Sequence, residues 1–154
     1  VLWERWFPKD PSMEMLDDKI QEGYRANDEV PGVPRARTKA WLVAWDWYRH
    51  ISKKHKLTSI AAFDDRFGAT QCVFNWVQDL ESELWSAGHR DPKMRQKRIE
   101  ISKACIPLFS PTDALTIANM KIAVAESHFD LGRKKMADKL FRKWLDQDPT
   151  IGTM

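Results

Sequence analysis

The chain has 154 residues, 43% of them hydrophobic and 31% charged, which is enough to bury a core without disulfides or metals and excludes a disordered chain. Its 25 basic and 22 acidic side chains are interleaved, so the net charge of +3 is only a weak sign of nucleic-acid binding. The two cysteines, Cys72 and Cys105, form no Cys-x-x-Cys pair, which argues against a zinc site and against a secreted disulfide scaffold.

The N-terminal region and the apolar runs indicate the compartment. Glu4 and Arg5 place charges at the start of the chain, and the longest apolar run, from Trp41 to Trp45, is far too short to cross a bilayer. We therefore expect a cytoplasmic protein without a membrane anchor. The chain opens at Val1 rather than at methionine, which is compatible with a segment trimmed from a longer protein.

Apolar residues at helical spacing divide the first half of the chain into helices, and strand signals are nearly absent. Asp10-Pro11 predicts the start of a first helix, which runs toward Asn27, because Asp is a favoured N-cap and Pro suits the first helical position. The further elements expected here are a loop over 27–34, a helix from about 35 to 54, a short helix capped by Thr58 or Ser59, and a helix from about 70 to 87 that stops at Gly88.

The second half is expected to hold three more helices. Asp91-Pro92 repeats the cap-and-proline signal, and Ser110-Pro111 ends the helix that it begins. The last two helices are expected from Thr112 or Asp113 to Gly132 and over 134–147. Short connections favour antiparallel neighbours. We therefore expect one all-α domain over 1–154, made of N-terminal helices (1–67), a hairpin (68–111) and a second hairpin (112–149).

Each helix has an apolar stripe that should face the core. The stripes are, in chain order, Met15, Leu16, Ile20 and Tyr24; Trp41, Ala44, Trp45, Tyr48 and Ile51; Val73, Trp76, Val77, Leu80 and Leu84; Met94, Ile101, Cys105 and Leu108; Ile117, Met120, Val124 and Leu131; and Met136, Leu140, Phe141, Trp144 and Leu145.

Residues 118–149 resemble one tetratricopeptide repeat, which has a first helix, a tight turn, a second helix with Ala-x-x-x-Phe, and a following proline. Ala137, Phe141 and Pro149 fall in those places. Val124 and Ala125 stand where the repeat has a large and then a small residue, and the small one lets the second helix approach. The resemblance implies antiparallel helical hairpins stacked as a short right-handed array, which binds peptides or proteins along a groove.

The repeat is degenerate, because Lys121, His128 and Trp144 replace the usual tryptophan, tyrosine and small residue. The segment 68–81, together with this C-terminal end, is similar to uncharacterised bacterial proteins in which such helices accompany a Cys-rich zinc motif of the SEC-C type. The chain has no such cysteine cluster, so no metal function carries over.

In tetratricopeptide proteins the groove is lined by the first helix of each repeat. The matching residues here, which are the candidates for a peptide-binding groove, are Asn119, Ile122, Glu126, Phe129 and Asp130. A mixed polar and aromatic groove suits a peptide, whereas the alternative is an ordinary solvated helix side. Ile122 and Glu126 replace the lysine and asparagine that clamp a peptide carboxylate in some repeat proteins, so that chemistry is not expected.

Two other groups are candidates for contacts with a partner. A polar row at helical spacing can hydrogen-bond an extended backbone or simply be helix surface; its members are Gln71, Asn75, Gln78 and Ser82. Among the eight tryptophans, those that fit no core stripe are candidates for a partner or homodimer contact; these are Trp3, Trp6, Trp47 and Trp85. Trp3 and Trp6 can instead hold the N-terminal arm on the body.

The alternative function is that of a nucleic-acid-associated accessory protein, which would use basic helices over 91–108 and 133–147. Interrupting acids and the lack of interleaved aromatic residues argue against it. Asp79 and Glu83 lie one turn apart but have no histidine at metal-ligand spacing, and no nucleophile stands beside a base. We therefore expect a non-enzymatic scaffold that binds a protein or peptide and needs no cofactor.

Overall fold

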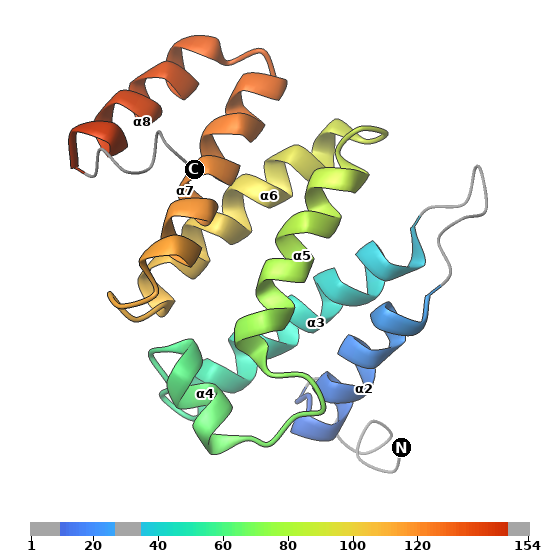
Figure 1. Ribbon diagram of the computed structural model, residues 1–154. Coiled ribbons are helices and arrows are strands. Elements are labelled where there is room, and N and C mark those ends of the chain that lie inside the picture. The colour runs from blue at the N-terminus through green and yellow to red at the C-terminus, as the bar shows by residue number, and fades with distance from the viewer. Residues whose placement is uncertain (1–9, 27–34, 148–154) are drawn as a thin grey trace. The chain divides into compact units, whose positions relative to one another are not determined.

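The computed structural model describes residues 10–26 and 35–147 (Figure 1). Within these ranges all regular elements are helical, which confirms the all-α class. The helices are α2 (Met13–Arg25), α3 (Ala36–Lys54), α4 (Ile60–Arg66), α5 (Val73–Ala87), α6 (Pro92–Cys105), the 3-10 turn η1 (Ile106–Leu108), α7 (Ala114–Asp130) and α8 (Lys134–Gln147). Among the described residues, no helix is both long and apolar enough to cross a bilayer. The predictions about Trp3, Trp6, the loop over 27–34 and Pro149 lie outside the described residues.

The chain forms two compact units, residues 1–80 and 81–154, and the boundary falls within α5. In the first unit α2 packs against α3. The stripes predicted for α3 and for the first part of α5 are buried, and rings fill the core; Tyr48, for example, lies 4.8 Å from Phe63 between ring centroids. That the whole chain is a single domain stays a prediction.

Two helix starts in the first unit differ from the prediction. α2 is capped by Ser12, whose Oγ accepts the Met15 N–H at 3.3 Å, so the predicted Asp10-Pro11 cap is wrong. Asp10 instead pairs with Lys54 Nζ at 2.6 Å, which occupies the carboxylate that would have capped the helix.

The start of α5 shifts for a similar reason. The Asp64 carboxylate accepts the backbone N–H groups of Val73 and Phe74 at 2.7 and 3.1 Å, and it thereby caps α5 from a distant position in the chain. Thr70, where the helix was expected to begin, donates its backbone N–H and its hydroxyl to Asp17. A helix start predicted from neighbouring residues was therefore three residues early.

In the second unit several sequence signals mark the helix ends, but α6 ends at Cys105 and is followed by η1 to Leu108, before the end predicted at Ser110-Pro111. Asp91 caps α6 by accepting the Lys93 N–H at 2.9 Å, as predicted. α7 and α8 form the hairpin expected in residues 112–149, with Gly132 at φ +74° between them. The Gly132 N–H donates to the Phe129 carbonyl and the Arg133 N–H to the His128 carbonyl, which is the Schellman pattern. The right-handed tetratricopeptide-like stacking stays a resemblance.

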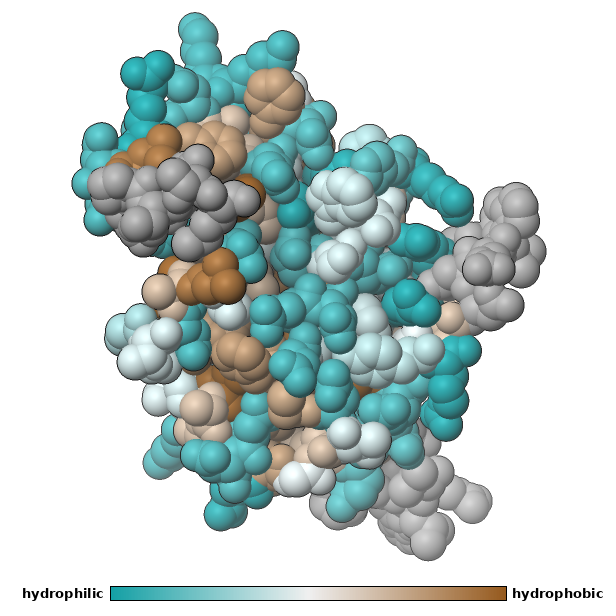
Figure 2. Space-filling view, in the orientation of Figure 1, coloured by the Kyte–Doolittle hydropathy of each residue, from teal (hydrophilic) through white to brown (hydrophobic). Residues whose placement is uncertain are grey.

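The core of the second unit contains Ile99, Ala118, Val124, Ala125 and Trp144. Val124 and Ala125 are fully buried, in keeping with the large-then-small pair. On α8, however, Met136 is 46% exposed and Leu145 is 37% exposed, so their predicted core placement is wrong. The side of α8 that carries Ala137 and Trp144 is buried, which leaves part of the apolar stripe on the surface; Figure 2 shows hydrophobic surface over this helix.

Candidate binding pocket

In the last turns of α7, one side of the helix is buried, and the side chains on the other side are exposed to solvent. Val124, Ala125 and the pair Ser127 and His128 face inward. Spacing of three and four residues then places the remaining side chains together on the outer side of the helix. These are Glu126, Phe129 and Asp130, three of the five groove candidates.

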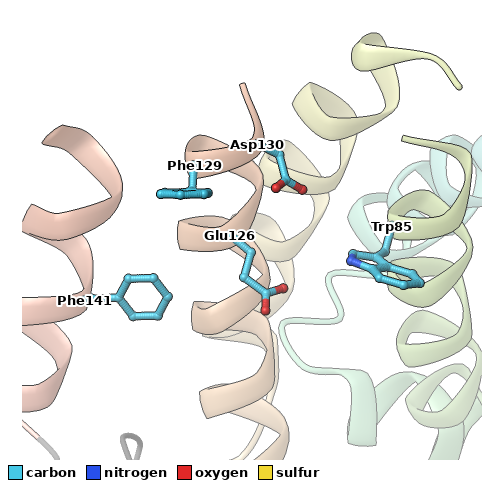
Figure 3. A pocket seen from close by; sticks show the side chains of 5 residues that line it. All are labelled: Trp85, Glu126, Phe129, Asp130 and Phe141. Atoms are coloured by element: carbon cyan, nitrogen blue, oxygen red, sulfur yellow. The ribbon is translucent and has the colours of Figure 1, made fainter. Parts of the chain in front are cut away.

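These three residues line one open pocket of about 340 Å³, together with a residue from α5 and one from α8. We call it the Trp85 pocket; its lining residues are Trp85, Glu126, Phe129, Asp130 and Phe141. Figure 3 shows Glu126 and Asp130 extending from α7 toward the Trp85 side, with Phe129 and Phe141 on the α8 side. All five belong to the second unit.

The pocket exposes aromatic surface. Trp85 is 44% exposed and Phe129 is 53% exposed. His89 holds the Trp85 region in place: its Nδ1–H donates to the Trp85 carbonyl at 3.1 Å, and its ring meets the indole edge at 4.6 Å between centroids. The wall formed by Trp85 is therefore supported from the end of its own helix.

Arg98 anchors one carboxylate of the pocket from behind. Its side chain is only 6% exposed, and its guanidinium donates to Glu126 Oε2 at 3.2 and 3.3 Å and to Ser127 Oγ at 3.2 Å. It also pairs with Glu81, with Nε donating to Oε1 at 2.5 Å. Burial raises the pKa of Glu81, and the Arg98 charge opposes that rise. Arg98 thus links α5, α6 and α7 beside the pocket.

Arg95 anchors the second carboxylate. Its side chain is 7% exposed, and its Nη1 lies 3.2 Å from Asp130 Oδ2, a distance that makes an ion pair without hydrogen-bond geometry. The stem of Arg95 crosses Gly88, where an added Cβ would lie 2.6 Å from Arg95 Cδ. Gly88 was predicted to stop α5, and the helix does end at Ala87, but only Gly132 among the described glycines has the positive φ typical of a glycine at a helix end. The structure uses Gly88 for a close approach instead.

Sequence reasoning missed these two arginines. It assigned α6 a stripe that contained Met94 and Leu108, which are only half-buried, whereas the buried side holds both arginines. The buried residues of α6 are Arg95, Arg98, Ile99, Ile101, Ser102 and Cys105. These residues recur at helical spacing, which could have indicated the buried side of α6. The pattern was missed because two of its members are arginines, which are expected on the surface.

The remaining groove candidates lie elsewhere. Asn119 is exposed and Ile122 packs against the core, and neither lines the Trp85 pocket. In the first unit, Gln71 precedes α5, and its Nε2 donates to the Tyr24 hydroxyl at 3.5 Å.

The other two members of the polar row in that unit lie on α5. Gln78 Nε2 donates to the Phe74 carbonyl at 2.9 Å, and Asn75 is exposed. The row is therefore not one continuous helical side.

The basic helices retain fewer available cations than their composition implied. Arg95 and Arg98 are buried, Lys97 pairs with Glu100 at 3.0 Å, and Arg142 pairs with Asp138 at 2.9 Å. Phosphate contacts need exposed cations, so Arg95 and Arg98 cannot make them, whereas Lys97 and Arg142 are 50% and 76% exposed; the nucleic-acid alternative stays a prediction.

Other predicted side chains have structural partners. Asp79 accepts a hydrogen bond from the Tyr24 hydroxyl, and Trp47 is half-buried with Lys19 Nζ 5.8 Å from its ring centroid. Over residues 10–26 and 35–147, no group of three or more His, Cys, Asp or Glu side chains is arranged to hold a metal ion.

No known family model, curated protein or solved structure matches the chain.

Proposed function

We propose that the chain is a non-enzymatic interaction module that binds a peptide or protein segment in the Trp85 pocket. The observation that carries the proposal is the concave site itself, where two exposed rings and two carboxylates from α5 and α7 converge. Exposed aromatic residues in a hollow are typical of binding hot spots, because a partner can bury large ring area there.

The size and chemistry of the pocket favour a partner side chain over a reacting substrate. A volume of about 340 Å³ lies at the low end for small-molecule sites and fits one or two side chains. Among the described residues, the lining includes no Ser, Cys, Lys or His that could act as a nucleophile or general base, and its carboxylates are held by Arg98 and Arg95. Binding is the activity that these residues support.

The test is selection of peptides from a random twelve-residue display library on the full chain, followed by affinity measurement. We expect Phe129→Ala to weaken a selected peptide by about tenfold or more, the usual loss for a hot-spot ring. Leu115→Ala is the matched control, because Leu115 lies on the same helix, is 58% exposed and does not line the pocket. It should change affinity by less than about twofold, as expected for a surface residue outside the contact.

Equal losses in the two variants, or no enriched peptide, would refute the proposal. Binding of a single-stranded oligonucleotide with a steep dependence on salt would instead favour the nucleic-acid alternative.

A further inference from the structure

We infer that the Trp85 pocket receives a lysine or arginine side chain, so that the partner segment is basic at this position. This rests on the proposed function and adds the chemical class of the ligand. The charges, the free acceptor oxygens and the rings of the pocket lead to it separately.

The carboxylates have acceptor capacity left on the solvent side. Arg98 donates hydrogen bonds to Oε2 of Glu126, and Arg95 forms an ion pair with Oδ2 of Asp130. Among the described residues, no hydrogen bond reaches Glu126 Oε1 or Asp130 Oδ1. The side chains remain 46% and 36% exposed. A carboxylate that is fixed on one oxygen and open on the other is a ready acceptor for an N–H donor.

The two charged side chains that line the pocket, Glu126 and Asp130, are both acidic. Glu81, Glu126 and Asp130 face two guanidiniums, those of Arg95 and Arg98, which lie behind them at 7% and 6% exposure. A ligand in the pocket therefore meets the carboxylates first. An acidic side chain would be repelled there, and an apolar one would desolvate two carboxylates without replacing their lost hydration.

The rings supply the second attraction for a cation. Trp85 has the aromatic ring type that binds cations best, and Glu126 extends toward it (Figure 3). The Phe129 ring already has a cation–π contact, since Lys134 Nζ lies over it, 5.5 Å from the ring centroid. Lys134 therefore shows that a cation suits this wall, and it also competes with an incoming cation through like charge.

The probes for the test are the N-acetyl methylamides of lysine, arginine and norleucine, titrated into the full chain. Binding is followed by NMR on the indole N–H signal of Trp85, which is assigned from its loss in Trp85→Phe. Norleucine keeps the alkyl chain and lacks the charge. We expect the lysine and arginine probes to shift the signal with at least about fivefold higher affinity than norleucine.

Three variants separate the contributions of charge and ring. Glu126→Gln keeps an acceptor for Arg98, and Phe129→Leu keeps apolar volume; each should lower the affinity of the lysine probe relative to norleucine by about threefold. Lys134→Met should strengthen the lysine probe about twofold to threefold, because it removes the competing cation. A role of Lys134 in folding alone would not produce a gain. Circular dichroism confirms that each variant is folded.

The inference fails if norleucine binds as well as lysine, or if Lys134→Met weakens the lysine probe or leaves it unchanged. The proposed function is judged separately. If selected peptides depend on Phe129 but tolerate norleucine in place of every lysine and arginine, the module binds peptides and only the basic-ligand inference is overturned. If no peptide depends on Phe129, both fail.

Discussion

Gly23→Ala is the substitution for which local helix propensity and tertiary packing predict opposite results. Gly23 lies in the last turns of α2, where alanine is favoured over glycine by about 1 kcal/mol. Propensity alone therefore predicts a more stable protein. In the structure, however, the Trp41 indole packs against Gly23, and an added Cβ would stand 2.7 Å from Trp41 Cε2 and closer still to Nε1 and Cδ1.

The cost can be worked out from what holds Trp41. The ring is 3% exposed, its Nε1–H donates to the Ile20 carbonyl at 3.0 Å, and its ring meets Tyr24 edge-on at 5.0 Å. Because the ring is enclosed, a methyl group forces strain of about 1–3 kcal/mol. Disturbing the buried hydrogen bond adds about 1 kcal/mol. After the propensity gain, we expect a net loss of about 1–3 kcal/mol in the free energy of unfolding.

The assay is urea unfolding followed by circular dichroism at 222 nm, supported by thermal melting. A loss of this size lowers Tm by about 3–10 °C in a chain of this length. Gly68→Ala is the control, since Gly68 has no heavy atom within 4 Å of an added Cβ and no positive φ. It should be neutral or stabilising by about 0.5 kcal/mol. If Gly23→Ala also stabilised the protein, the packing of Trp41 on Gly23 described above would be wrong.

Three further predictions concern a strained backbone position, a buried histidine and a buried ion pair. Lys56 has φ +56° after α3, a backbone conformation that glycine adopts without strain. Lys56→Gly should therefore raise the free energy of unfolding by about 1 kcal/mol and shift the urea midpoint upward; a lower midpoint would contradict this. Burial, helped by Lys103 and Arg133, lowers the pKa of His128. As the pH falls, His128 is therefore protonated in the unfolded chain before it is protonated in the folded one. Between pH 7.5 and 5 the wild type should lose more free energy of unfolding than His128→Phe, and equal losses in the two proteins would refute this prediction. Arg98→Met should cost about 3 kcal/mol by leaving Glu81 buried without its cation, and Glu81→Met in the same chain should restore most of it; purely additive losses would exclude the pair.

The sequence by itself determined the helical class and the helix ends whose signals are local. Ser59 and Asp91 cap their helices, and Gly132 turns the chain between α7 and α8, because each of these devices acts on backbone groups within a few residues. The tetratricopeptide resemblance selected Glu126, Phe129 and Asp130 as candidates, and α7 carries them together on its outer side.

Only the tertiary structure decided which distant groups these residues meet. The cap of α5 comes from Asp64, and the anchors of the pocket carboxylates are Arg95 and Arg98, which local patterns assign to a solvated basic face. A buried arginine is stable only where carboxylates from other helices reach it, and that condition involves residues 17 and 28 positions away in the chain for Arg98. Trp85 and Phe141 entered the sequence analysis for unrelated reasons, and they line one pocket because the packing of α5, α7 and α8 brings them there.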